Sequence, residues 1–198
     1  MDLFAMIEAG FPADKKEQCR KVASTIGIKT ISHYPLGFCD GYNSENELYA
    51  LSDGTMIRIP YRVYFCENDT AYDGMNVEEK LICDCVFTRS SNGFLRQKHL
   101  RRILETEIPE WCMPYLLRLS AEYVVEIIDC IYCALLSGDH AAIQAFCLQN
   151  SALLKRSYQR MTSYWNEYYK QQYPVFHDYV GFKLYKHIFA PHLNLERL

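Results

Sequence analysis

A change in hydrophobic periodicity near residue 76 constrains the fold of this chain more than any other feature. Between residues 47 and 65, the short runs ELYAL, TMIRI and PYRVYF are rich in β-branched and aromatic residues, which is typical of strands. From Asn76 onward, apolar residues recur at helical spacing instead, and Asn76 itself is placed to cap the first helix. The sequence therefore predicts an α+β protein that is predominantly α-helical.

Two regions with different organisation follow from this change. Asp53-Gly54 separates two of the strand-like runs and indicates a hairpin turn, because glycine accepts the positive φ that a tight turn needs. We predict a small N-terminal lobe, residues 1–75, that mixes short helices with this β-hairpin. Residues 76–198 are predicted to form an irregular bundle of about six helices. No segment between them is long enough or rich enough in Gly and Ser for a free linker, so one compact unit is the alternative.

One long helix is predicted within this bundle. The run YLLRLSAEYVVEIIDCIYCALL, residues 115–136, follows a proline that suits the first turn of a helix. On such a helix Glu122, Glu126 and Asp129 fall at i, i+4 and i+7 and form an acidic strip on one face. The strip is either a polar seam that receives a cation such as Arg118, or a metal site in an enzyme. We favour the seam, because no Glu-x-x-His accompanies the strip and the chain carries no local catalytic motif.

The stretch RSSNGFLRQKHLRRILE, residues 89–105, concentrates basic side chains in a chain of slightly acidic net charge. When it is wound into a helix, Leu100, Ile103 and Leu104 share one face. The opposite, solvated face carries most of the cations, namely Lys98, Arg101 and Arg102. Arg96 instead points along the apolar face, so we expect it to escape to solvent at the helix start or to meet a buried acid such as Asp84.

The C-terminal part of the chain is basic and rich in tyrosine. Residues 151–198 hold seven Lys and Arg against three Asp and Glu. Basic residues among aromatic ones either bind nucleic acid through charge and stacking or mark a protein interface. Helical spacing also allows one aromatic side of this segment to pack against the core. The candidate interaction residues in this segment are Arg160, Tyr164, Trp165, Tyr168 and Lys170.

Composition and cysteine usage indicate the compartment. Hydrophobic residues make up 49% and charged residues 23% of the chain, which is typical of a soluble globular protein. The nine cysteines are an odd number, and the closest pairs, Cys83 with Cys85 and Cys130 with Cys133, fall on predicted helices among apolar neighbours. We therefore predict core cysteines, no metal and no cofactor. The first residues lack a signal-peptide pattern and no apolar run reaches the ~18 residues of a membrane span, so we expect a cytoplasmic protein.

Three functional hypotheses follow. The leading one is a non-enzymatic cytoplasmic protein that serves as a protein–protein interaction or regulatory module and binds another protein or itself. The alternative is a nucleic-acid-binding protein that uses the basic helix 94–105 and the basic, Tyr-rich C-terminal segment. The second alternative is an enzyme without a local motif that uses the acidic strip. No membrane partner is expected. The residues expected to be polar and buried are Asp84, Arg96, Arg118, Glu122 and Glu126.

Overall fold

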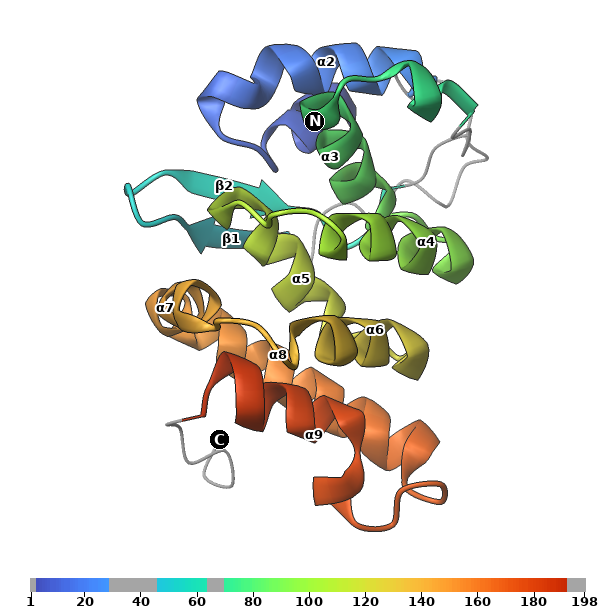
Figure 1. The fold of residues 1–198 in the computed structure, drawn as a ribbon, viewed down its shortest axis with the longest axis vertical. Coiled ribbons are helices and arrows are strands. Elements are labelled where there is room, and N and C mark those ends of the chain that lie inside the picture. Colours follow the sequence, from blue (N-terminus) through green and yellow to red (C-terminus); the bar gives the residue numbers. More distant parts are fainter. Residues whose placement is uncertain (1–2, 29–45, 64–69, 192–198) are drawn as a thin grey trace. The chain divides into compact units, whose positions relative to one another are not determined.

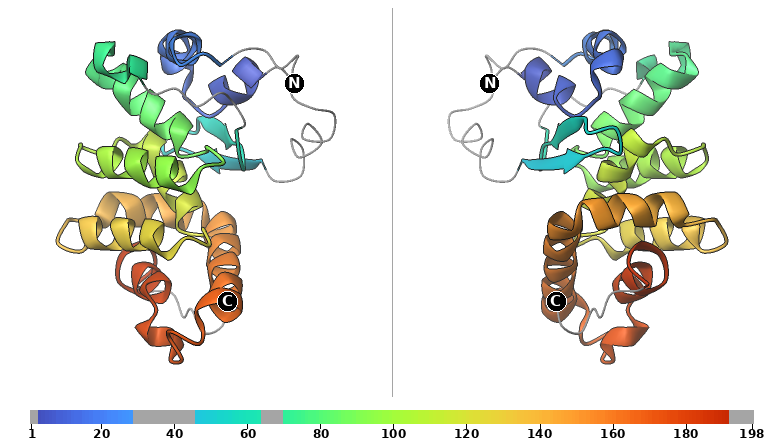
Figure 2. Two further views of the ribbon diagram at one scale, coloured as in Figure 1. Left: turned by 90° about the vertical axis from the view of Figure 1, so that its right-hand side faces the viewer. Right: turned by 90° about the vertical axis from the view of Figure 1, so that its left-hand side faces the viewer.

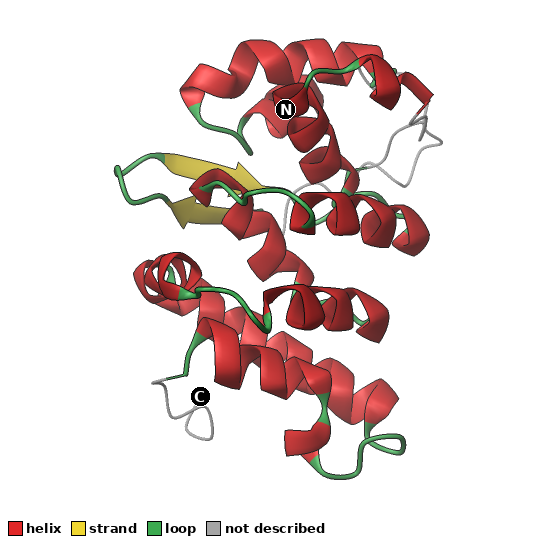
Figure 3. Cartoon of the chain, viewed as in Figure 1, coloured by secondary structure: helices red, strands yellow, loops and turns green. Residues whose placement is uncertain are grey.

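The computed structural model describes residues 3–28, 46–63 and 70–191, and there the chain is an α+β protein dominated by helices (Figure 1). The predicted fold class is confirmed, since helices occur in both halves and the described strands form one small antiparallel sheet (Figure 3). Close packing divides the chain into two compact units, Met1–Ile103 and Leu104–Leu198. The boundary predicted between residues 75 and 76 stays a prediction.

None of the helices in the described ranges combines the length and the apolar character that crossing a bilayer requires.

The first unit places short helices around a hairpin. In chain order its elements are α1 (Leu3–Glu8), η1 (Ala13–Lys15), α2 (Lys16–Thr25), β1 (Glu47–Ala50), β2 (Met56–Ile59), η3 (Thr70–Gly74), α3 (Val77–Phe87) and α4 (Gly93–Leu104).

The β-hairpin forms where the sequence predicts it. Strands β1 and β2 pair antiparallel, with Glu47 opposite Ile59 at one end of the ladder. Gly54 adopts a φ of 85°, and the carboxylate of Asp53 accepts a hydrogen bond of 2.8 Å from the backbone N–H of Thr55. The third strand-like run, PYRVYF, contributes an isolated parallel bridge between Val63 and Ser90 within the described residues. Its last residues, and the segment 29–45 with Cys39, lie outside the residues that the structure describes.

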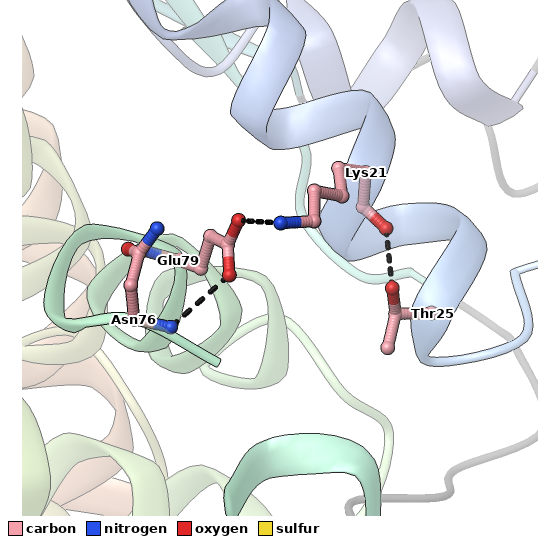
Figure 4. Close-up of polar contacts among 4 residues, drawn as sticks. All are labelled: Lys21, Thr25, Asn76 and Glu79. Atoms are coloured by element: carbon pink, nitrogen blue, oxygen red, sulfur yellow. Dashed lines mark hydrogen bonds and ion pairs between the residues drawn. The ribbon is translucent and has the colours of Figure 1, made fainter. Parts of the chain in front are cut away.

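Helix α3 begins at the predicted cap, and the cap also joins α3 to α2. The Asn76 side chain accepts the backbone N–H of Glu79, while the Glu79 carboxylate accepts the backbone N–H of Asn76, which makes a capping box. The other carboxylate oxygen of Glu79 binds the ammonium group of Lys21 on α2 (Figure 4). Lys21, and then the Asn76 N–H, hold the pKa of Glu79 below its usual range. A local capping signal thus also docks one helix onto another.

The second unit consists of helices in the part that the structure describes. Its elements are η4 (Glu110–Cys112), α5 (Met113–Leu119), α6 (Val125–Leu135), α7 (Ala141–Gln149), α8 (Ser151–Tyr164), the π-helical turn η5 (Trp165–Tyr169), η6 (Phe176–Asp178), α9 (Val180–Leu184) and the π-helical turn η7 (Tyr185–Phe189).

The single long helix predicted for residues 115–136 is wrong, because the chain leaves helical geometry between α5 and α6. Hydrogen bonds from distant residues replace the helical ones at this break. The Tyr169 hydroxyl donates to the carbonyl oxygen of Tyr123 at 2.7 Å and accepts the N–H of Val125 at 3.2 Å. The Ser120 hydroxyl lies 2.7 Å from the hydroxyl of Tyr185. The partners lie 44 to 65 residues away along the chain, so no local pattern could reveal the break.

Helix α9 holds the core of the second unit together. It packs against α6 and α8, and α8 runs across the direction of α7 (Figure 2). A Cβ atom at Gly181 of α9 would stand 2.6 Å from the ring of Tyr179 and 2.7 Å from the sulfur of Met161 on α8. A side chain at position 181 would therefore have to displace the Tyr179 ring or the Met161 side chain.

Candidate functional site

The basic stretch identified in the sequence forms the corner between α3 and α4. Arg89 is buried and donates to the carbonyl oxygens of Pro60 at 3.2 Å and Tyr61 at 2.7 Å. Arg96 is fully buried and donates two hydrogen bonds of 3.0 Å to the carbonyl oxygens of Ser90 and Ser91. Carbonyl groups in a turn have no helical partner, and a buried one is costly without a donor. Both arginines therefore have a structural role at this corner.

Asp84 takes partners other than the predicted Arg96. Its carboxylate accepts the Tyr72 hydroxyl at 2.8 Å, and its other oxygen lies 2.6 Å from Nδ1 of His99. Arg102 lies 3.9 Å from the same carboxylate, and its guanidinium sits 3.8 Å above the Tyr72 ring. Burial, and then the bond to Asp84, raise the pKa of the Tyr72 hydroxyl. We call this group, Tyr72, Asp84, His99 and Arg102, the aspartate cluster.

The aspartate cluster resembles part of a catalytic site in its chemistry, but a substrate could not reach it. A carboxylate that holds a histidine ring is the arrangement that orients a general base. His99, however, has no exposed surface, and its ring stacks on Phe87 with 4.2 Å between the centroids. A substrate would have to displace this core packing to reach the imidazole. The cluster therefore joins η3, α3 and α4 as a buried polar contact.

These contacts remove cations from the surface that the sequence suggested for phosphate binding. Of the four candidates on α4, Arg96 is buried and Arg102 covers the Tyr72 ring. Lys98 and Arg101 remain exposed. His99 was not among the sequence candidates, although its position beside the apolar face of α4 was a signal for burial.

The acidic strip predicted on one helix face does not form. Glu122 lies buried in the connection between α5 and α6, whereas Glu126 and Asp129 are exposed on α6. The expectation that Glu126 is buried is therefore wrong, while Arg118 is buried on α5. The break between the two helices rotates Glu122 out of register with the other two carboxylates. In the described part of the chain, no three His, Cys, Asp or Glu side chains gather closely enough to hold a metal ion.

The cysteines divide into buried and surface positions. Cys133 is exposed, contrary to the prediction of a core cysteine, and Cys130 is partly exposed. Partial burial, and then the Asp129 carboxylate, raise the pKa of the Cys133 thiol, so neither activates it as a nucleophile. Cys66 lies outside the described residues. The cysteines described as buried and free of disulfides are Cys19, Cys83, Cys85, Cys112 and Cys147.

Tyrosine rings from two distant segments meet on the surface of the second unit. Tyr123 lies in the connection before α6, and its ring contacts Tyr164 of α8 at 6.2 Å between centroids. Tyr164 in turn contacts Tyr168 of η5 at 6.1 Å. Tyr123 is 47% exposed and Tyr168 is 62% exposed. We call these three residues the tyrosine cluster. The Tyr169 hydroxyl holds it together, because it fixes the connection that carries Tyr123.

Basic residues lie close to the tyrosine cluster along the chain. Arg160 lies one helical turn before Tyr164 on α8. Exposed Lys170 donates to the Asn166 side chain at 3.2 Å, and its ammonium group lies 5.7 Å from the centre of the Trp165 ring. The surface thus combines aromatic rings with positive charge.

Two of the three members of this cluster were predicted, and Tyr123 was not. The sequence placed Tyr123 in the middle of a long helix, where nothing singled it out. Tyr164 and Tyr168 are four residues apart and therefore share a helix face, whereas the contribution of Tyr123 depends on the break before α6.

This chain matches no protein-family model, no curated protein and no solved structure.

Proposed function

We propose that this protein is a non-enzymatic interaction module that binds an acidic segment of another protein through the tyrosine cluster. The observation that carries the proposal is the surface contact of Tyr123, Tyr164 and Tyr168, which come from two segments and include strongly exposed rings. Tyrosine provides a large contact area with few rotatable bonds, and it is enriched among residues that dominate binding energy. A ring group of this kind is suited to form the centre of an interface.

The charge of the second unit supports the acidic character of the partner. Residues 151–198 carry seven basic residues against three acidic ones, and Arg160 lies one helical turn before Tyr164 of the cluster. Opposite charges at the rim of an interface speed association and exclude partners of like charge. An acidic segment with an apolar or aromatic centre fits both properties of the surface.

Nucleic acid is the competing partner, because it too binds cations and aromatic rings. The ring planes argue against it. Tyr123 and Tyr164 meet at 71°, and Tyr164 and Tyr168 at 35°, so the rings do not form parallel platforms on which successive bases could stack. The basic helix α4, the other surface considered for phosphate, has Arg96 buried and Arg102 placed over Tyr72.

We also propose that the protein works in the cytoplasm. None of the seven cysteines in the described ranges forms a disulfide, and reduced cysteines are the usual state in a reducing compartment. A fractionation experiment on cells that contain the full chain tests this assignment.

The binding proposal is tested with the full chain as bait in native lysate, followed by cross-linking and mass spectrometry with and without nuclease. The variant combines Tyr123→Ser and Tyr168→Ser, and Phe94→Ser is the matched control, because Phe94 is an aromatic residue that is 86% exposed in the first unit. We expect acidic proteins that are recovered by wild type and control, and at least about tenfold less by the double variant. Equal recovery by all three baits contradicts the proposal, and partners that vanish with nuclease favour nucleic acid.

A further inference from the structure

The first turn of α6 is capped by a tyrosine from a distant part of the second unit. The residue before the helix, Val124, makes no capping hydrogen bond with its side chain. Helix starts usually take such a bond from a neighbouring Ser, Thr, Asp or Asn. Here the backbone N–H of Val125 donates instead to the hydroxyl of Tyr169 at 3.2 Å, although 44 residues separate the two along the chain. The start of α6 therefore depends on η5.

The same hydroxyl also holds the residue on the other side of the cap. It donates to the carbonyl oxygen of Tyr123 at 2.7 Å. A tyrosine hydroxyl has a single proton to donate, and burial raises the pKa of the Tyr169 hydroxyl, so this proton stays in place at neutral pH. One oxygen atom thus fixes the backbone on both sides of Val124. Because Tyr123 belongs to the tyrosine cluster, that atom also sets the place of an exposed ring of the cluster.

Tyr169 is itself held by the core of the second unit. Its ring stacks on the ring of Tyr179, with 5.6 Å between the centroids and 24° between the planes, and Tyr179 has no exposed surface. The preceding residue, Tyr168, is 62% exposed and contacts Tyr164 of the cluster. Within η5, one tyrosine therefore faces the binding surface while the next reaches α6. Such π-helical turns are rare and frequently occur at functional sites.

The two ends of the connection between α5 and α6 are anchored separately. At its beginning, the Ser120 hydroxyl lies 2.7 Å from the hydroxyl of Tyr185 in η7. At its end, the Tyr169 hydroxyl makes the two bonds described above. Removal of the Tyr169 hydroxyl alone leaves the first anchor and the stack on Tyr179 in place. The change therefore releases the end that carries Tyr123 without removing a packed side chain.

We propose that Tyr169 is a positioning residue for partner binding: its hydroxyl places the Tyr123 ring where an acidic partner contacts it, so that binding at the tyrosine cluster and capping of α6 are coupled. The inference rests on the proposed function, because it concerns the same surface. Holding an interface ring in place before binding reduces the entropy that binding costs. Coupling is reciprocal, so a partner that holds Tyr123 also stabilises the hydrogen bond at the start of α6.

The test is titration of a fluorescently labelled random copolymer of glutamate and tyrosine with the purified full chain. The variant is Tyr169→Phe, which keeps the ring and its stack on Tyr179. Tyr173→Phe is the matched control, because the Tyr173 ring also packs on Tyr179, at 5.5 Å, but its hydroxyl lies 3.5 Å from the Gln172 side chain. We expect the dissociation constant to rise about fivefold to tenfold for Tyr169→Phe and less than about twofold for the control.

Double variants show whether Tyr169 acts through Tyr123. In a Tyr123→Ser background, Tyr169→Phe should weaken binding by less than about twofold further, because the ring that it positions is gone. In a Tyr168→Ser background it should keep its full effect. Hydrogen exchange at the Val125 N–H gives a second readout, which the copolymer should slow in wild type but not in Tyr169→Phe. Circular dichroism checks that every variant is folded.

Two results would overturn the positioning role alone. One is a Tyr169→Phe protein that binds the copolymer like wild type, while the combination of Tyr123→Ser and Tyr168→Ser loses binding. The other is an equal effect of Tyr169→Phe in both backgrounds, which indicates a general structural role. Copolymer binding that neither Tyr123→Ser nor Tyr168→Ser weakens contradicts the proposed function, and the positioning role with it.

Discussion

The two units place the same kinds of residue, cations and aromatic rings, in opposite environments. In the first unit Arg96 is fully buried on backbone carbonyl groups, and Arg102 covers the ring of Tyr72 at 3.8 Å. In the second unit Tyr168 is 62% exposed, and Lys170 is exposed beside Trp165. The first arrangement supplies hydrogen-bond donors to a turn, and the second leaves rings and charge available to a partner. A basic aromatic stretch in a sequence therefore indicates a binding surface only where the fold leaves its side chains exposed.

Replacing Arg96 should give the largest loss of stability. The change Arg96→Met keeps most of the side-chain volume but removes the guanidinium group that donates to the carbonyl groups of Ser90 and Ser91. Ser90 is buried and Ser91 is exposed, so water can replace the lost donor only at Ser91. The loss of a donor at a buried carbonyl costs about 1–3 kcal/mol, so we expect a loss of about 2–3 kcal/mol in the first unit. Urea unfolding gives the total, and hydrogen exchange in α3 and α4 localises the loss.

The control for Arg96 lies on the same helix. Arg101 is exposed on α4, so Arg101→Met should change the unfolding free energy by less than about 0.5 kcal/mol. Equal effects of the two substitutions would show that burial does not separate structural from surface arginines in this stretch.

A smaller loss is expected in the second unit when its closest helix contact is disturbed. In Gly181→Ala, the new methyl group would stand 2.6 Å from Tyr179 and 2.7 Å from Met161. Overpacking costs about 1–3 kcal/mol, and alanine's better helix propensity returns about 1 kcal/mol. We expect a net loss of about 1–2 kcal/mol in thermal unfolding. In Gly138→Ala the new methyl group would stand 3.7 Å from the carbonyl oxygen of Leu135, an ordinary contact, so this control should be close to neutral.

The contact between α2 and α3 should make stability depend on pH. The folded protein holds the pKa of Glu79 below its usual range, through Lys21 and then the Asn76 N–H. A lowered pKa means that the stabilisation is present above the range in which unfolded Glu titrates, and is lost as pH falls through the folded value. Glu79→Gln should therefore lower the melting temperature at neutral pH and have less effect in acid. The matched control is Glu105→Gln, because Glu105 is exposed, and at neutral pH it should lower the melting temperature less than Glu79→Gln does.

Some elements of this fold can be predicted from the sequence and others cannot. The start of α3 and the hairpin turn were predicted, because Asn76 and Asp53-Gly54 act on their immediate neighbours. The direction of Arg96 followed from helical geometry, but its carbonyl partners did not. The break before α6 depends on Tyr169, 44 residues away from the Val125 N–H that it binds. Features that depend on contacts between distant segments, such as the place of Tyr123 in the tyrosine cluster, could not be predicted from local sequence patterns.

The smallest effect on stability is expected at the tyrosine cluster itself. Tyr168 is mostly exposed, so Tyr168→Ser should change the unfolding free energy by less than about 0.5 kcal/mol. A loss as large as that of Arg96→Met would place Tyr168 in the core of the second unit and remove the contrast between the two regions.

The most direct test of the contrast between the buried basic stretch and the exposed tyrosine cluster is a recovery experiment. It compares how much acidic partner protein Tyr168→Ser and wild type recover at two salt concentrations. The account predicts a folded variant that recovers several-fold less partner, and a wild-type recovery that falls as salt screens the basic residues of the C-terminal segment. Undiminished recovery by a folded Tyr168→Ser protein at both salt concentrations would contradict it.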